Sequence, residues 1–206
     1  MTYRVCFVCT GNICRSPMAE HVFRARVEEA GLGGAVEVDS AGTGGWHEGD
    51  GADPRTVAVL EEHGYTSAHT ARQFRASWFP VLDLVIALDE GHLRELRRLA
   101  RTPDEAAKVR LLRSYDPAAG EALDVPDPYY GGREGFVECL EMTEAASEGL
   151  LTAVRAGLGE IHGSSGQGRP RESQRSTEGY PRDSPGRAEG DTAGETSGDE
   201  IEERTR

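Results

Sequence analysis

The stretch Tyr3-Arg-Val-Cys-Phe-Val-Cys9-Thr-Gly-Asn-Ile-Cys-Arg15-Ser-Pro-Met18 decides the fold of this chain. Its apolar run, Val5 to Val8, predicts a buried strand that stops at Cys9. A polar, well-spaced stretch from Met18 to Ala30 predicts a helix, and Pro17 suits its first turn. The sequence therefore indicates a strand, a tight loop and a helix N-terminus, with a cysteine opening the loop and an arginine closing it.

The loop has the composition of an anion-binding site. Gly11 relaxes the backbone where the chain must turn, and Asn12 tolerates left-handed geometry better than most residues. Inward-facing backbone N–H groups form a nest for an anion, and the helix N-terminus adds the positive end of its dipole. Arg15 supplies a planar fork that can grip two phosphate oxygens. These groups favour the thiolate form of Cys9, which makes it a nucleophile beneath an oxyanion cradle.

Strands and helices alternate along the following residues. The expected strands are 36–39, 82–88 and 109–112, and the expected helices are 54–63, 91–100 and 134–158, with a loop at 40–45. This order predicts an α/β fold: a single three-layer domain with a four-stranded parallel sheet flanked by helices, and the anion-binding loop after the first strand. Ligands bind such sheets at the carboxyl ends of strands, where Cys9, Ser40 and Asp89 are expected.

The composition changes abruptly near the C-terminus. Residues 163–206 contain no Leu, Val, Phe or Trp and are rich in Gly, Ser, Glu and Arg. Such a segment cannot bury enough apolar surface to offset its ordering entropy. We therefore expect one domain at residues 1–162, followed by a disordered polar tail at residues 163–206.

Charge and hydropathy limit the partners. The net charge of −13 disfavours non-specific binding to nucleic acid or to an acidic membrane. The apolar run near the N-terminus is too short for a signal peptide, and nothing approaches the ~18 apolar residues of a spanning helix. Four cysteines in 206 residues do not form the disulfide framework of a secreted protein. We expect a cytoplasmic protein.

The run Cys9-Thr-Gly-Asn-Ile-Cys-Arg15-Ser-Pro-Met-Ala-Glu20 resembles the signature of the low-molecular-weight protein tyrosine phosphatases, in their bacterial form. The resemblance extends over about residues 3–158. It implies hydrolysis of phosphotyrosine through a cysteinyl-phosphate, with Cys9 as nucleophile and Arg15 as phosphate clamp, and with no metal or cofactor. The phosphate-binding loop would then comprise Thr10, Gly11, Asn12, Ile13, Cys14 and Ser16.

A second segment, Asp124-Val-Pro-Asp-Pro-Tyr-Tyr-Gly-Gly132, contains the expected general acid. Asp-Pro often begins a turn for local reasons, but the run from Asp127 resembles the family's general-acid loop. One carboxyl group can protonate the departing phenolic oxygen and then deprotonate the attacking water. Tyr129, Tyr130 and Trp46 are expected to wall a cleft deep enough for a phenyl ring and too deep for phosphoserine.

The resemblance also implies supporting roles for several residues. Asn12 would hold the loop through hydrogen bonds to Ser40 and His69. Ser16 could cap the helix, donate a hydrogen bond to the nucleophile, or do both. Related phosphoarginine phosphatases carry threonine where this chain has Ile13, so isoleucine favours phosphotyrosine.

The cysteines other than Cys9 allow several interpretations. Cys14 either fills space beside the helix start or forms a reversible disulfide with Cys9 after oxidation. Cys6-x2-Cys9 suggests zinc, but a strand places these residues on opposite faces and no second ligand pair follows, so no metal is expected. Cys6 and Cys139 fit buried core thiols.

Two other functions compete with a phosphatase. An arsenate reductase of similar fold needs two further cysteines near residues 80–90, which this chain lacks. A catalytically silent phosphotyrosine-binding module would not need Cys9, Arg15 and Asp127 together. We expect phosphotyrosine proteins as substrates, inorganic phosphate or other oxyanions as competitive ligands, no nucleic-acid or membrane partner, and a monomer.

Overall fold

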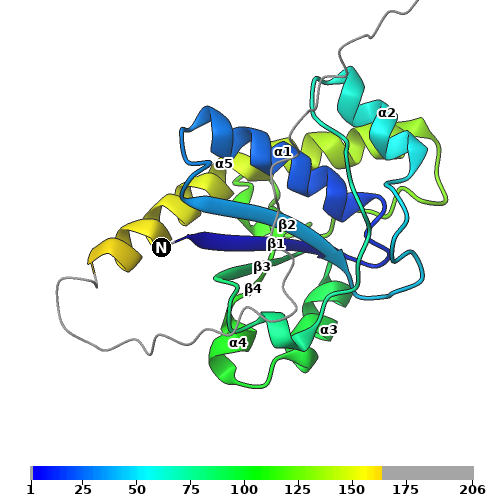
Figure 1. Ribbon diagram of the computed structural model, residues 1–206. Helices are drawn as coiled ribbons and strands as arrows, with labels where there is room; N and C mark the ends of the chain where they lie inside the picture. The colour runs from blue at the N-terminus through cyan, green and yellow to red at the C-terminus, as the bar shows by residue number, and fades with distance from the viewer. Residues whose placement is uncertain (1, 164–206) are drawn as a thin grey trace, which may run out of the picture.

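A computed structural model describes residues 2–163 of the chain, and it forms one α/β domain (Figure 1). The four parallel strands lie in the order β2-β1-β3-β4 and are β1 Tyr3–Cys9, β2 Val36–Gly42, β3 Leu84–Ala87 and β4 Val109–Leu111. The α-helices are α1 Arg15–Glu29, α2 Pro54–Glu62, α3 Glu90–Leu99, α4 Pro103–Ala107 and α5 Arg133–Gly163. Two 3-10 turns are η1 Ala76–Trp78 and η2 Leu112–Tyr115.

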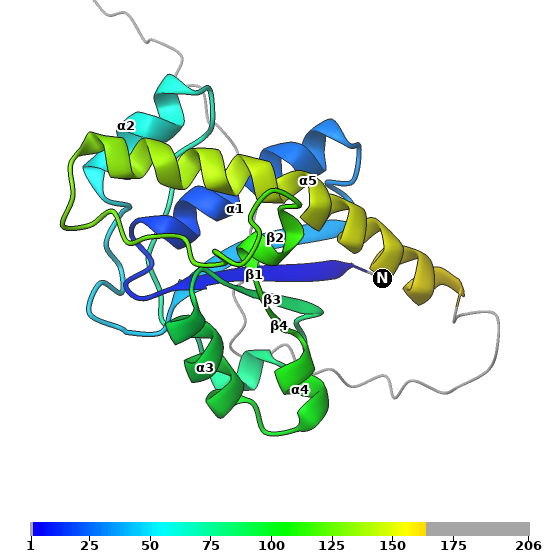
Figure 2. The ribbon, with the colours of Figure 1, turned by 180° about the vertical axis from the view of Figure 1, so that it is seen from behind.

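The sheet is the middle of three layers. Helices α1 and α5 cover one face, and α3 and α4 lie on the other side (Figures 1 and 2). Two hydrophobic cores lie on the two faces of the sheet. Phe7 belongs to the core beneath α1 and α5, with Met18 and Leu140, whereas its neighbour Cys6 belongs to the core beneath α3, with Leu96. Because successive strand residues face opposite ways, the apolar run of β1 supplies both cores. The parallel four-stranded sheet and the flanking helices confirm the fold expected from the sequence.

Several expected boundaries were wrong. Residues 40–42, expected in a loop, continue β2 because they pair in register with residues 7–9 of β1. Strand β3 is shorter than the apolar run 82–88, and α4 was not expected at all. Helix α1 begins at Arg15, before Pro17, so the helix N-terminus lies closer to the loop than the proline indicated. The expected tail at 163–206 lies outside the described residues, apart from Gly163 at the end of α5.

The topology creates a crevice at the carboxyl end of the sheet. Strand β1 leads to α1 on one face, while its neighbour β3 leads to α3 on the other. Such a reversal leaves a crevice between the two connections, where ligands of open α/β sheets bind. The 9–15 loop and Asp89 lie at this position. Within residues 2–163, no helix has the length and apolarity needed to cross a membrane.

Candidate active site

The loop between β1 and α1 turns its carbonyl groups outward. Four of them accept hydrogen bonds from neighbouring segments: Cys9 O from Thr43 N at 2.8 Å, Thr10 O from Gly44 N at 2.9 Å, Asn12 O from His69 Nε2 at 2.7 Å, and Ile13 O from Asp53 N at 2.8 Å. Within the described chain, the amides of residues 11–15 donate to no protein group. With its carbonyls engaged outside, the loop presents its N–H groups to an anion.

Asn12 fixes the shape of this loop. It has a φ of 57°, in the left-handed region that asparagine tolerates. Its side-chain oxygen accepts from the Arg72 amide at 2.9 Å, and its amide nitrogen donates to the hydroxyls of Ser16 and Ser40, each at 2.9 Å. Gly42 leaves the room required, because a Cβ there would lie 2.7 Å from the Thr10 carbonyl oxygen.

Cys9 lies at the bottom of the loop beside Ser16. The two side chains are 3.0 Å apart, Sγ to Oγ, and both residues are buried. Ser16 is the second residue of α1, and its side chain caps no backbone amide, so the N-cap alternative was wrong. Because Asn12 donates to Ser16 Oγ, the serine proton is available to Cys9 or to the Ala41 carbonyl, 3.2 Å away.

Arg15 is held by acceptors on two other segments. Its Nη1 donates to Asp89 Oδ2 at 2.8 Å and to the Val125 carbonyl at 3.2 Å, and its Nη2 donates to Asp127 Oδ2 at 2.9 Å. The Arg15 side chain is 4% exposed, whereas that of Asp127 is 43% exposed. The guanidinium is thus fixed beside the loop, and the more exposed Asp127 carboxylate lies on its open side.

His92 completes a ring of contacts behind Arg15. Its Nδ1 lies 2.9 Å from Asp89 Oδ1, and its Nε2 lies 2.9 Å from Thr10 Oγ1, which in turn is 3.4 Å from Arg15 Nη2. Burial raises the pKa of Asp89, but hydrogen bonds from His92 and the charge of Arg15 outweigh it and hold that pKa well below its usual range. Asp89 therefore stays ionised against Arg15.

The 124–132 segment carries Asp127 to the mouth of the loop. Asp127 Oδ1 accepts from the Tyr129 amide at 3.2 Å, a local turn contact of the kind that Asp-Pro favours. Arg55 of α2 steadies the segment: its Nη1 donates to the Gly131 carbonyl at 3.2 Å, and its guanidinium lies 4.5 Å from the centre of the Phe136 ring. The Arg55 guanidinium also donates two hydrogen bonds to the Asp53 carboxylate. Because the Asp53 amide donates to the Ile13 carbonyl, Arg55 links the 124–132 segment to the phosphate-binding loop.

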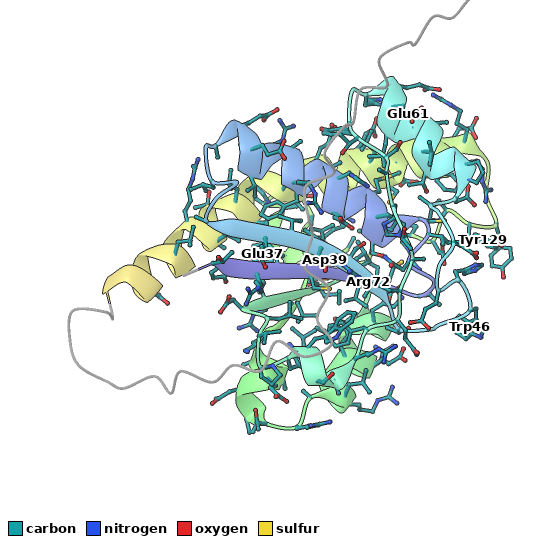
Figure 3. The ribbon with its side chains drawn as sticks, in the orientation of Figure 1. Glu37, Asp39, Trp46, Glu61, Arg72 and Tyr129 are labelled. Carbon is teal, nitrogen blue, oxygen red and sulfur yellow. The ribbon has the colours of Figure 1, made fainter. Side chains whose placement is uncertain are left out.

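These residues enclose a cavity of about 340 Å³, within the usual range of small-molecule sites. Cys9 and Arg15 lie at its base, and Ile13 lines its side. Trp46, Tyr129 and Tyr130 form the upper walls, with exposed fractions of 76%, 39% and 94%. Figure 3 shows Trp46 and Tyr129 at the same edge of the molecule, on separate loops. The cavity is therefore lined by the thiol of Cys9, the guanidinium of Arg15 and the carboxyl group of Asp127, together with three aromatic side chains.

Ser40 and His69 lie behind the loop and do not line the cavity. Ser40 Oγ donates to Glu20 Oε2 at 2.5 Å, and His69 Nδ1 lies 3.8 Å from the same oxygen. Burial lowers the pKa of His69, which keeps its ring neutral with Nε2–H aimed at the Asn12 carbonyl. This buried network supports the loop from beneath.

The other three cysteines are buried thiols. Burial raises the pKa of Cys6, Cys14 and Cys139 to about 12 in each case. Cys6 lies in the core on the opposite face of the sheet from Cys9. Cys14 is buried in the same core as Cys9, beside the start of α1. In residues 2–163, no group of three or more His, Cys, Asp or Glu side chains is arranged to hold a metal ion.

Asp89 lies at the ligand-binding end of the sheet, as its position directly after an apolar strand predicts, but its contact with Arg15 was not predicted. His92, three residues later in α3, carries no such signal because a single histidine on a helix is usually structural. The contacts of Glu20, Arg55 and Arg72 join segments far apart in sequence, and no local pattern predicts them.

Comparisons with known proteins agree with this geometry. The family model for the low molecular weight phosphotyrosine protein phosphatases matches residues 4–159. A low molecular weight protein-tyrosine-phosphatase of Streptomyces coelicolor is 80% identical over 156 residues, which are 75% of this chain and 95% of that protein.

Solved structures show the same fold. A protein tyrosine phosphatase from Entamoeba histolytica, with Hepes in its active site, is 33% identical and superposes with a TM-score of 0.72 over 76% of this chain and 99% of that one. A Drosophila arginine phosphatase is 34% identical, with a TM-score of 0.68 over 73% of this chain and 96% of that one. The chain belongs to the low molecular weight phosphotyrosine protein phosphatase family.

Proposed function

We propose that this protein is a protein-tyrosine phosphatase that hydrolyses phosphotyrosine through a cysteinyl-phosphate. The observation that carries the proposal is the position of the Cys9 sulfur beneath inward-facing loop amides, 3.0 Å from the Ser16 hydroxyl, in a cavity that also contains Arg15 and Asp127. The names of the relatives support the same activity.

In the first step, the Cys9 thiolate attacks phosphorus. The bond between phosphorus and the phenolic oxygen breaks as the bond from sulfur to phosphorus forms. The loop amides and Arg15 hold the equatorial oxygens, where charge is spread in the transition state. The Ser16 hydroxyl stabilises the thiolate before attack and after release of phosphate.

Asp127 serves as acid and then as base. In the unliganded site its carboxylate is paired with Arg15 Nη2. A bound phosphate dianion takes over that Nη2, and the freed Asp127 carboxylate takes up a proton from solvent. The neutral carboxyl group then turns toward the leaving oxygen and donates this proton to it. Asp127 next accepts a proton from water, the water oxygen attacks phosphorus, and the sulfur–phosphorus bond breaks to restore the thiolate and release phosphate.

The aromatic walls favour phosphotyrosine as the substrate. Phenyl groups stack well against Trp46, Tyr129 and Tyr130, and a serine phosphate is too short to reach Cys9 from the rim. Likeness to the Drosophila arginine phosphatase raises phosphoarginine as a second candidate. Ile13 lines the cavity and offers an apolar contact where related phosphoarginine phosphatases carry threonine, which favours the aryl ester.

The remaining assignments belong to the same proposal. Thr10, Gly11, Asn12 and Ser16 form or hold the phosphate-binding loop, with Ser40 and His69 as supports. Cys14 is the thiol that pairs with Cys9 after oxidation. The protein acts as a cytoplasmic monomer on phosphotyrosine proteins, and inorganic phosphate and other oxyanions compete for the loop.

Paired measurements on Cys9→Ser and the wild type test this function. The wild type should release phosphate from phosphotyrosine peptides and from para-nitrophenyl phosphate, and the variant should not. The variant should still bind vanadate or phosphate, because the amides and Arg15 remain. Phosphatase activity in Cys9→Ser would contradict the mechanism, and hydrolysis of phosphoarginine in preference to phosphotyrosine would contradict the substrate.

A further inference from the structure

A second cavity adjoins the catalytic one. It has a volume of about 610 Å³ and lies between the 43–46 segment and α3. Thr10 and Trp46 line both cavities, so the two share a boundary. Among the residues that line the second cavity, Asp89 and His92 hold Arg15, whereas Gln73, Glu95 and Arg98 have no part in the proposed mechanism.

The boundary at the rim is a single indole ring. Trp46 folds back over Gly44, where a Cβ would come within 1.9 Å of the indole Cζ3. With 76% of its surface exposed, the indole stands up from the loop and is not covered by other side chains. A polypeptide whose phosphotyrosine fills the catalytic cavity therefore needs to cross only this ring to place a neighbouring side chain in the second cavity.

Some charged side chains of the second cavity are paired within the protein and others are not. Asp89 is already paired with Arg15 and His92. The side chains of Glu95 and Arg98, both on α3, form no hydrogen bond or ion pair within the described part of the chain. Glu95 is half-buried whereas Arg98 is exposed. Because exposed charges gain little from pairing, the half-buried carboxylate of Glu95 decides which charge the cavity attracts.

The opposite wall provides a further acceptor, the side-chain oxygen of Gln73. Gln73 Nε2 donates to the Thr43 carbonyl at 3.0 Å, which turns Gln73 Oε1 toward Gly45. Glu95 and Gln73 thus offer acceptor oxygens from two sides of one cavity. A guanidinium or ammonium group carries several donors and a positive charge, and it matches this lining better than a carboxylate or an apolar side chain does.

We propose that the second cavity is a substrate subsite that binds a basic side chain, arginine or lysine, close in sequence to the phosphotyrosine. The inference rests on the proposed phosphatase function and extends it to a class of protein substrate. It predicts that Glu95 contributes to the KM of peptides and not to that of small aryl phosphates, which do not reach beyond Trp46.

The test uses phosphotyrosine peptides that carry a single arginine, alanine or glutamate at each of the three positions before and after the phosphotyrosine. At one or more positions, arginine should lower KM relative to alanine by about 1.5-fold to fivefold, the range of one partly exposed charge pair. Glu95→Gln should remove that preference and leave para-nitrophenyl phosphate unaffected. Glu138→Gln, an exposed α5 residue that lines neither cavity, is the matched control and should retain the preference.

The variant Arg98→Gln tests whether the second cavity binds a basic or an acidic side chain. It should strengthen the preference for arginine, because it removes a like charge from the cavity. A preference for glutamate that Arg98→Gln abolishes would overturn the proposal in favour of an acidic occupant. Equal KM values for all peptides, with para-nitrophenyl phosphate still hydrolysed, would overturn the subsite alone; loss of activity on every phosphate ester would contradict the phosphatase function instead.

Discussion

His92 Nε2 lies 2.9 Å from Thr10 Oγ1, which joins α3 to the phosphate-binding loop. Because Nδ1 faces the Asp89 carboxylate, a neutral ring carries its proton there and accepts the Thr10 hydroxyl proton at Nε2. Thr10 Oγ1 can then accept from Arg15 Nη2, and Arg15 Nη1 donates to Asp89. The four side chains form a closed ring of contacts: three are hydrogen bonds, and the fourth is the close approach of His92 Nδ1 to Asp89 Oδ1.

This ring predicts a positioning role for His92. His92→Ala should lower kcat/KM for para-nitrophenyl phosphate about tenfold and weaken inhibition by phosphate to a similar extent, because Arg15 loses its orientation. His92→Asn can keep the contact to Asp89 and should recover part of both losses. His63→Asn, on the opposite side of the sheet, is the control. If His92→Ala lowered the melting temperature but left the inhibition by phosphate unchanged, His92 would contribute only to packing, and the positioning role would be wrong.

Asp127→Ala should reveal a dependence on the leaving group. Its kcat/KM for phenyl phosphate should fall by about 100-fold or more, the usual loss of a general acid. The loss should be much smaller for dinitrophenyl phosphate, whose leaving oxygen needs no proton. Steady-state kinetics on both esters provide the measurement. Equal losses on the two esters would exclude Asp127 as the acid and leave it a structural partner of Arg15.

The fold was largely predictable because its signals are local. The apolar run of β1, the turn residues Gly11 and Asn12 and the helix after Arg15 each follow from short-range preferences. The strand order, the continuation of β2 to Gly42 and the α4 turn depend on pairing between distant segments, which local patterns do not encode.

Some residues of the candidate site could likewise be predicted from local sequence, and others could not. Cys9, Arg15 and Asp127 lie in motifs, so sequence could identify them. His92, Arg55 and Glu20 act through contacts across the fold and had to be found in the structure. Ser16 was ambiguous in sequence because a helix cap and a nucleophile partner occupy the same position in the chain.

The stability of the domain should fall as the pH is lowered through about 6.5. Burial lowers the pKa values of His21 and His69, so below that pH the unfolded chain binds protons that the folded chain does not. Each such histidine adds a slope of at most about 1.4 kcal/mol per pH unit to the free energy of unfolding, the value reached where it is charged in the unfolded chain and neutral in the folded one. Stability is therefore retained above this range and lost below it.

His21→Gln isolates one of these contributions. Urea unfolding of the variant between pH 5 and 6.5 should show a smaller pH slope than that of the wild type, the difference being at most about 1.4 kcal/mol per pH unit. At pH 8, where both histidines are neutral in either state, any difference reports only packing and the hydrogen bond from His21 to Thr66. Identical slopes for the two proteins would show that His21 charges freely in the folded state.

Cys14 should protect Cys9 from irreversible oxidation. Hydrogen peroxide converts the Cys9 thiolate to a sulfenic acid with release of hydroxide, and the Cys14 thiol then attacks the sulfenic sulfur and displaces water to form a disulfide. The raised pKa of Cys14, about 12, makes this second step slow. After peroxide and then dithiothreitol, the wild type and a Cys6→Ser control should regain activity and Cys14→Ser should not. Equal recovery in all three proteins would leave Cys14 as a packing residue.

The covalent intermediate on Cys9 tests the central claim most directly. Rapid acid quenching of the enzyme during turnover of a phosphotyrosine peptide, followed by mass spectrometry, identifies any residue that carries a phosphoryl group. The account predicts one phosphoryl group on the peptide that contains Cys9, appearing before free phosphate accumulates. A phosphoryl group on another residue, or none while phosphate is released, would contradict it.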